Sequence, residues 1–191
     1  MNPTLDSASM SAETLSTPRS AACTAAPVAG RYSPWRTANA PTLIYVHGGA
    51  WRSGSSSRCH APAEMFIDHG CNYIALDFNN VLETGGDLMP MIDQVRRAVV
   101  WVYRNARSFR ADPEKLYIFG HSSGAHLTGN VLTTDWPKMY DAPMSILKGG
   151  MCTSGMYELA PVRLSARSKY VNFTDAMVEA LSSIRRIPLI N

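Results

Sequence analysis

The sequence is poor in charged residues and has no long apolar run. Only 17% of its 191 residues are Asp, Glu, Lys or Arg, and the formal net charge is +3. So mild a charge does not predict a nucleic-acid partner. The longest apolar run, 98–103, falls far short of the ~20 residues that cross a bilayer, so no membrane span is expected. With 46% hydrophobic residues, the chain is too apolar to be wholly disordered.

Cysteine is scarce, and its spacing forms no motif. None of the four cysteines lies in a CxxC pair, the spacing typical of zinc and redox sites. We therefore expect reduced thiols in an intracellular protein. The N-terminus lacks the basic start and apolar core of a secretory signal, so a cytoplasmic location is expected by default. The cysteines are Cys23, Cys59, Cys71 and Cys152.

The chain divides by composition into two parts. Residues 1–41 are rich in Ala, Ser, Thr and Pro and show no helical or strand period, which predicts a low-complexity, flexible segment. Residues 42–191 show an orderly pattern and are interpreted as one partial α/β domain.

Short apolar runs alternate with helical patterns in the second part. This alternation predicts a mostly parallel sheet with helices on both faces. In the longest helical pattern, from Leu88 to Ala106, apolar residues recur every three or four positions. Asp112-Pro113 is expected to break the chain, and Thr174 is a candidate N-cap. Strands are expected at 43–46, 73–76, 116–119 and 146–152, with a fifth beginning at 188–190, and helices at 62–69, 88–106, 123–133 and 175–183.

Ser122 is the candidate nucleophile. It is the central residue of Gly120-His121-Ser122-Ser123-Gly124, a G-x-S-x-G match between an expected strand and an expected helix. Such a sharp turn lifts the serine hydroxyl out of the sheet. The flanking glycines are expected because a side chain there would collide with the neighbouring strand and helix.

A second glycine motif, His47-Gly48-Gly49-Ala50-Trp51, also follows an expected strand directly. Acyl transfer through a serine needs hydrogen-bond donors aimed at the oxyanion of the tetrahedral intermediate. Backbone N–H groups of Gly48, Gly49 and Ser123 are the candidates for this oxyanion hole. Trp51 could line an acyl pocket, or it could simply pack the loop.

Together the two motifs resemble the kynurenine formamidase (arylformamidase)-like group of the α/β-hydrolase fold, which carries an HGGxW loop and a GHSAGAH-type serine turn. The similarity extends over roughly 41–187, including Ser154 to Leu159. It implies a serine hydrolase that cleaves an aryl formamide or small carboxylic ester, with no metal or organic cofactor. A small-molecule substrate is the expected partner, with no nucleic acid or membrane.

The sequence departs from that family in its catalytic triad and in the strands expected at the two edges of the sheet. A serine nucleophile needs a histidine base and an orienting carboxylate, in the order Ser, acid, His. His126 is the last histidine and belongs to the serine motif itself, so the acid and histidine are expected beyond residue 191. The sheet is expected to be incomplete at both ends. The alternative interpretation is a truncated or non-catalytic hydrolase-like protein.

Three other patterns do not support a function. Residues 49–56 have the outline of a phosphate-binding loop, but Ser55 replaces its lysine. His121 and His126 are five residues apart, which does not place them on a common helix face for a metal. The arginines between Arg96 and Arg110 are interpreted as a solvated helix face.

Overall fold

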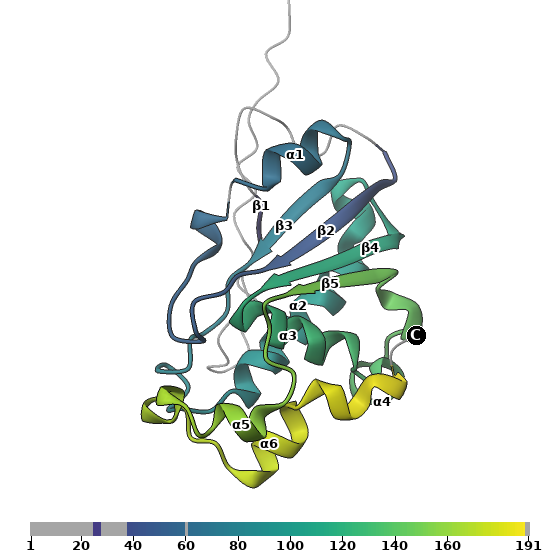
Figure 1. Ribbon diagram of the computed structural model, residues 1–191. Coiled ribbons are helices and arrows are strands. Elements are labelled where there is room, and N and C mark those ends of the chain that lie inside the picture. The colour runs from purple at the N-terminus through teal and green to yellow at the C-terminus, as the bar shows by residue number, and fades with distance from the viewer. Residues whose placement is uncertain (1–24, 28–37, 60, 190–191) are drawn as a thin grey trace, which may run out of the picture.

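A single five-stranded sheet forms the centre of the computed structural model, which describes residues 25–27, 38–59 and 61–189 (Figure 1). The strand order is β1-β3-β2-β4-β5. Strands β2 to β5 run parallel, and only β1 runs antiparallel, against β3. The expected α/β class with a mostly parallel sheet is confirmed. The strands are β1 (Ala25–Pro27), β2 (Ala40–Val46), β3 (Asn72–Leu76), β4 (Ala111–His121) and β5 (Gly149–Thr153).

Alternating side chains divide the sheet into two apolar faces. Ile44 lies opposite Ile74 on one side and Ile118 on the other, and all three are at most 1% exposed in the larger core. Residues one position along the strands point to the opposite face, where Tyr45 stacks on Tyr73 with ring centroids 5.9 Å apart. This period of two is the normal geometry of a strand.

Helices cover both faces unequally. α2 (Met89–Asn105) and α3 (Ser123–Leu132) pack on the face of the larger core, and the short α1 (Ala63–Asp68) lies on the other face (Figure 1). The predicted amphipathic helix is confirmed, because its apolar positions 91, 92, 95, 99 and 102 are buried in α2. The expectation that Arg96 lies on a solvated face is wrong, because this residue is 5% exposed and donates to Thr134 Oγ1 and to the Asn130 carbonyl.

The remaining helices are short and connect the longer elements. Thr174 caps α6 as predicted, since its hydroxyl accepts a hydrogen bond from the Met177 amide. These helices are α4 (Trp136–Tyr140), α5 (Leu159–Val162), α6 (Asp175–Leu181), η1 (Ser56–Arg58), η2 (Ala106–Phe109), η3 (Met144–Ile146), η4 (Ala166–Lys169) and η5 (Ser183–Leu189). None of the helices in the described ranges has both the length and the apolar character to cross a bilayer.

Two predictions near the chain ends are wrong. Residues 188 and 189 end the 3-10 helix η5 instead of beginning a strand, and residue 190 lies outside the described residues. Pro188 has no N–H to donate to a sheet ladder, which disfavours a strand there. Strand β1 lies within the segment 1–41, where no strand period is visible, because three residues are too few to show one. The rest of that segment, apart from 38–41, lies outside the description.

Two strand boundaries also differ from expectation. β4 already begins at Ala111, which pairs with Ala40, while the next pair is Thr42 with Leu116. Residues 112–115 therefore bulge out of the ladder, so Asp112-Pro113 interrupts the register without ending the strand. β5 begins three residues later than expected, because 144–146 form η3.

Candidate active site

Ser122 occupies a strained turn between β4 and α3. Its φ of 56° and ψ of −123° place it in a sparsely populated region, at a cost of order 1–3 kcal/mol. Three hydrogen bonds fix this backbone: the Ser122 N–H donates to Thr153 O at 2.8 Å, and the Ser122 carbonyl accepts from Ala125 and His126. The turn predicted from the G-x-S-x-G motif is therefore held by β5 on one side and by the first turn of α3 on the other.

The two glycines that flank Ser122 allow this close packing. A Cβ built on Gly120 would lie 2.3 Å from Thr128 Oγ1, and one built on Gly124 would lie 2.1 Å from the Val46 carbonyl oxygen. Real Cβ atoms do not approach backbone oxygens so closely. A side chain at either position would therefore collide with the neighbouring strand or helix, as predicted.

Residues 47–51, named here the glycine loop, approach Ser122 from the next strand. Val46 pairs with Gly120 in the parallel register, so the loop after β2 and the turn after β4 emerge side by side. A Cβ on Gly48 would lie 3.1 Å from Ser122 Cβ. Within the described part of the chain, the N–H groups of Gly48, Gly49 and Ser123 donate to no protein acceptor. Ser123 also begins α3, where the helix dipole favours negative charge.

The glycine loop has an unusual backbone. Gly49, Ala50 and Trp51 have φ values of 125°, 54° and 64° in succession. A left-handed conformation costs about 1–2 kcal/mol for each residue that carries a Cβ. Contacts elsewhere must therefore hold the loop in this shape.

Trp51 anchors the loop inside the protein. Its side chain is 2% exposed, its Nε1 donates to His126 Nδ1 at 3.2 Å, and its carbonyl accepts from the Val81 amide at 2.7 Å. The indole also lies edge-on to Phe173. So little exposure leaves only a small area of Trp51 for contact with a substrate.

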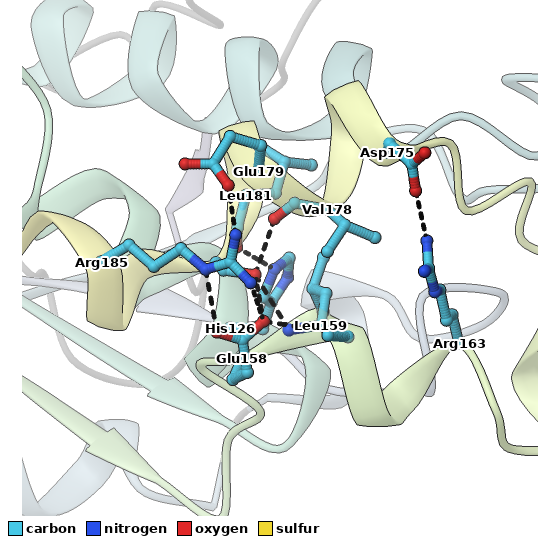
Figure 2. Close-up of polar contacts among 11 residues, drawn as sticks. His126, Glu158, Leu159, Arg163, Asp175, Val178, Glu179, Leu181 and Arg185 are labelled. Atoms are coloured by element: carbon cyan, nitrogen blue, oxygen red, sulfur yellow. Dashed lines mark hydrogen bonds and ion pairs between the residues drawn. The ribbon is translucent and has the colours of Figure 1, made fainter.

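His126 is fully enclosed on α3. Burial lowers its pKa to about 4, so the ring is neutral near pH 7. Its Nε2 lies 3.0 Å from the carbonyl oxygen of Leu181 at the end of α6 (Figure 2). Both ring nitrogens are occupied, which agrees with the expectation that His126 is not the missing base.

Among the described residues, no histidine side chain is hydrogen-bonded to the Ser122 hydroxyl. His47 Nδ1 lies 2.8 Å from the Gly48 carbonyl, and its Nε2 lies 3.8 Å from Asp77 Oδ1. His69 is the C-cap residue of α1, and its Nδ1 lies 2.7 Å from Met65 O. His121 is exposed beside Gly48. His60 lies outside the described residues.

Most acidic residues after Ser122 serve as caps or ion-pair partners. Asp135 accepts from the Lys138 amide, and Asp175 pairs with Arg163. Glu158 accepts hydrogen bonds from Arg185, and this partner, followed by the Ala160 amide, lowers its pKa to about 2 (Figure 2). Glu179 also pairs with Arg185.

A cavity of 310 Å³ borders the glycine loop. Its walls include Trp51, the carboxylates of Asp77 and Glu83, and the nearly buried ring of His47. The volume is within the usual range of small-molecule sites, and the lining is mainly polar. No cluster of three or more metal-ligating side chains occurs among the described residues.

The model of the BD-FAE family, an α/β-hydrolase family, matches residues 32–144, more than half of the chain. The chain belongs to the BD-FAE family. This match includes both glycine motifs and the strands that carry them, so the expected α/β-hydrolase fold is confirmed.

Curated relatives of this BD-FAE chain include two kynurenine formamidases. The one from Danio rerio is 36% identical over 142 residues, covering 74% of this chain and 44% of the relative. The one from Salmo salar is 33% identical over 152 residues, covering 79% of this chain and 48% of the relative. The expected similarity to the kynurenine formamidase-like group is confirmed. The chain spans about half the length of these relatives.

Solved esterases share the fold. The structure of Thermogutta terrifontis esterase 2 phosphoramylated by tabun matches with a TM-score of 0.65 and 18% identity, covering 89% of this chain and 68% of that one.

The sequence alone does not predict one feature of the site in this BD-FAE chain, the hydrogen bond from Trp51 to His126. These residues are 75 positions apart, so no local pattern connects them.

Proposed function

We propose that the whole protein is a serine hydrolase that cleaves an aryl formamide or a small carboxylic ester through an acyl-enzyme on Ser122. One observation carries the proposal: Ser122 stands on a strained strand-to-helix turn, with Gly48 of the glycine loop against it. The kynurenine formamidase relatives favour an aryl formamide as the substrate class.

In the first step, Ser122 Oγ bonds to the carbonyl carbon of the substrate, and a base takes the hydroxyl proton. The tetrahedral intermediate then loses the aryl amine, or the alcohol of an ester, which leaves with a proton. Water attacks the resulting acyl-Ser122, releases formate or another carboxylate and restores the serine hydroxyl. The residues need no cofactor for these steps.

The amides of Gly48, Gly49 and Ser123 are assigned to the oxyanion. Gly48 lies against Ser122, Gly49 is the next residue of the glycine loop, and Ser123 follows Ser122 directly; none of the three amides donates to a protein acceptor among the described residues. Loss of one such donor typically lowers the rate about 10²–10³-fold. Trp51 contributes to substrate binding only through the cavity wall that it forms together with His47.

Replacement of the nucleophile tests the proposal. Ser122→Ala should abolish hydrolysis and labelling by a serine-directed fluorophosphonate. Ser154→Ala is the matched control, because Ser154 also has a φ of 56° and follows the neighbouring strand β5. Full activity in Ser122→Ala would refute the assignment. Turnover of an aryl formamide compared with that of a short acyl ester then decides the substrate class.

A non-catalytic hydrolase-like protein is the second candidate. It is favoured by one observation: His126, the histidine of the serine motif, is buried and bonded at both ring nitrogens, so it is not free to take the Ser122 proton. A chain of this kind would bind a small molecule in the cavity beside the glycine loop without turnover. Rapid stoichiometric labelling of Ser122 would exclude this candidate, because labelling requires an activated serine.

A further inference from the structure

We propose that His126 is a positioning residue, which holds the glycine loop in its working shape through the Trp51 indole. The inference rests on the proposed function for its effect on rate. The residue does not face the reacting atoms: it lies one helical turn beyond Ser122, inside the protein, and contacts the loop from behind.

The hydrogen bonds determine how the His126 ring is protonated. An indole N–H can only donate, so His126 Nδ1 must accept the bond from Trp51. The ring proton is therefore on Nε2, which donates to Leu181 O at 3.0 Å. One side of the ring thus holds the glycine loop, and the other side is held by the end of α6.

Asn130 supports this arrangement from the next turn of α3. Its Nδ2 donates to Leu181 O and to the His126 carbonyl, and its Oδ1 accepts from Arg186 at 2.6 Å. Arg96 donates to the Asn130 carbonyl from α2. The charged groups facing this region are thus cations, and no carboxylate contacts the imidazole among the described residues. The surroundings keep His126 neutral.

The glycine loop depends on this anchor because its own backbone is strained. Three successive residues with positive φ lead from Gly49 to Trp51. The Trp51 indole is tied to His126, while the Trp51 carbonyl is tied to Val81. If the indole is released, the loop can relax and move the Gly48 and Gly49 amides away from Ser122. A misplacement of about 1 Å can lower an enzymatic rate about 10²-fold.

Two conservative replacements separate the halves of the His126 ring. His126→Asn places an acceptor oxygen near Nδ1 and loses the donor to Leu181. His126→Gln places a donor near Nε2 and loses the acceptor for Trp51. Thr133→Val, at the C-cap of α3, is the control, because the Thr133 hydroxyl is buried and donates to Gly129 O, away from the glycine loop.

In the full chain, His126→Gln and Trp51→Phe should each lower kcat by about 10- to 100-fold with little change in KM, by analogy with loss of an oxyanion donor. The double variant should lose no more than either single one. His126→Asn should retain kcat, and Thr133→Val should lower the unfolding midpoint without changing kcat. Equal losses in His126→Asn and His126→Gln, or additive losses in the double variant, would overturn the inference.

Hydrogen exchange of the Trp51 indole N–H, assigned with Trp51→Phe, gives a readout independent of activity. Exchange should be faster in His126→Gln than in His126→Asn or the original chain. If the original chain neither hydrolyses substrate nor reacts with the fluorophosphonate, the proposed function fails, and the exchange rates still decide the positioning role. Equal exchange in both variants would refute that role.

Discussion

Two sets of polar contacts lie near the end of α6, one around His126 and one around Arg185, and they differ in burial and in charge. Around His126 the groups are buried, neutral and bonded on both sides, from Trp51 to Leu181. Around Arg185 the groups are charged and more exposed: the side chains of Arg185 and Glu158 are about one-third exposed and that of Glu179 is 71% exposed (Figure 2). Both lie within a few residues of the end of α6.

The difference shows which set can position a site. A buried polar group that loses its partner pays the full desolvation penalty, so it has few alternative arrangements. Exposed ion pairs are screened by water and salt and typically contribute little. The His126 contacts therefore determine geometry at the glycine loop, whereas the Arg185 contacts mainly attach the surface of α6.

The largest expected effect is the loss of stability caused by crowding the contact between α3, which carries His126, and β2. Gly124→Ala would place a Cβ 2.1 Å from the Val46 carbonyl oxygen, so α3 and β2 would have to separate. We expect a loss of more than about 3 kcal/mol in the free energy of unfolding, since overpacking against backbone cannot be relieved by a rotamer change. Urea unfolding measures it.

Gly149→Ala is the matched control for that variant. A Cβ there would be 3.5 Å from its nearest neighbour, a ring atom of Tyr117, which is ordinary contact. Its stability should stay close to that of the original chain. Similar losses in the two variants would show that the contact between α3 and β2 is not specially tight.

A smaller effect should appear as a pH dependence of the free energy of unfolding, caused by His126. The pKa of His126 is about 4 in the folded chain, against about 6.5 in the unfolded chain. Between these values only the unfolded state binds the proton, so stability is complete above pH 6.5 and falls as the pH drops toward 4. The expected loss is on the order of 3 kcal/mol.

Urea unfolding at pH 7, 5.5 and 4 measures this loss. His126→Asn should flatten the dependence in that window, because asparagine does not titrate. His69→Asn is the control, since His69 is exposed on the end of α1 and its removal should leave the dependence in place. A dependence that persists unchanged in His126→Asn would mean that another group titrates.

The smallest effect concerns the exposed set. Arg185 lowers the pKa of Glu158 to about 2, so the pair contributes stability above the ordinary carboxyl value, and this contribution is lost as the pH falls from about 4.5 toward 2. Glu158→Gln should slightly lower the unfolding temperature in low salt. The difference should vanish at high salt, because exposed pairs are screened. A decrease that survives 1 M salt, at roughly a 3 Å Debye length, would contradict the surface role.

Much of the fold could be predicted because its signals are local. Four of the expected strands and the long amphipathic helix are present, and both glycine motifs follow strands as predicted. The exceptions have weak or conflicting local signals. β1 depends on pairing with β3, and Pro188 begins a short apolar run whose composition alone does not distinguish a strand from another conformation.

The sequence by itself determined the two turns, because glycines at 48, 49, 120 and 124 and a serine between two of them restrict the backbone over a few residues. The tertiary structure alone decided that these turns meet. The parallel register that pairs Val46 with Gly120 brings Gly48 against Ser122, and burial gives His126 the Trp51 indole as a partner. Such contacts join residues tens of positions apart, and they form only when strand pairing and exclusion of water bring distant segments together.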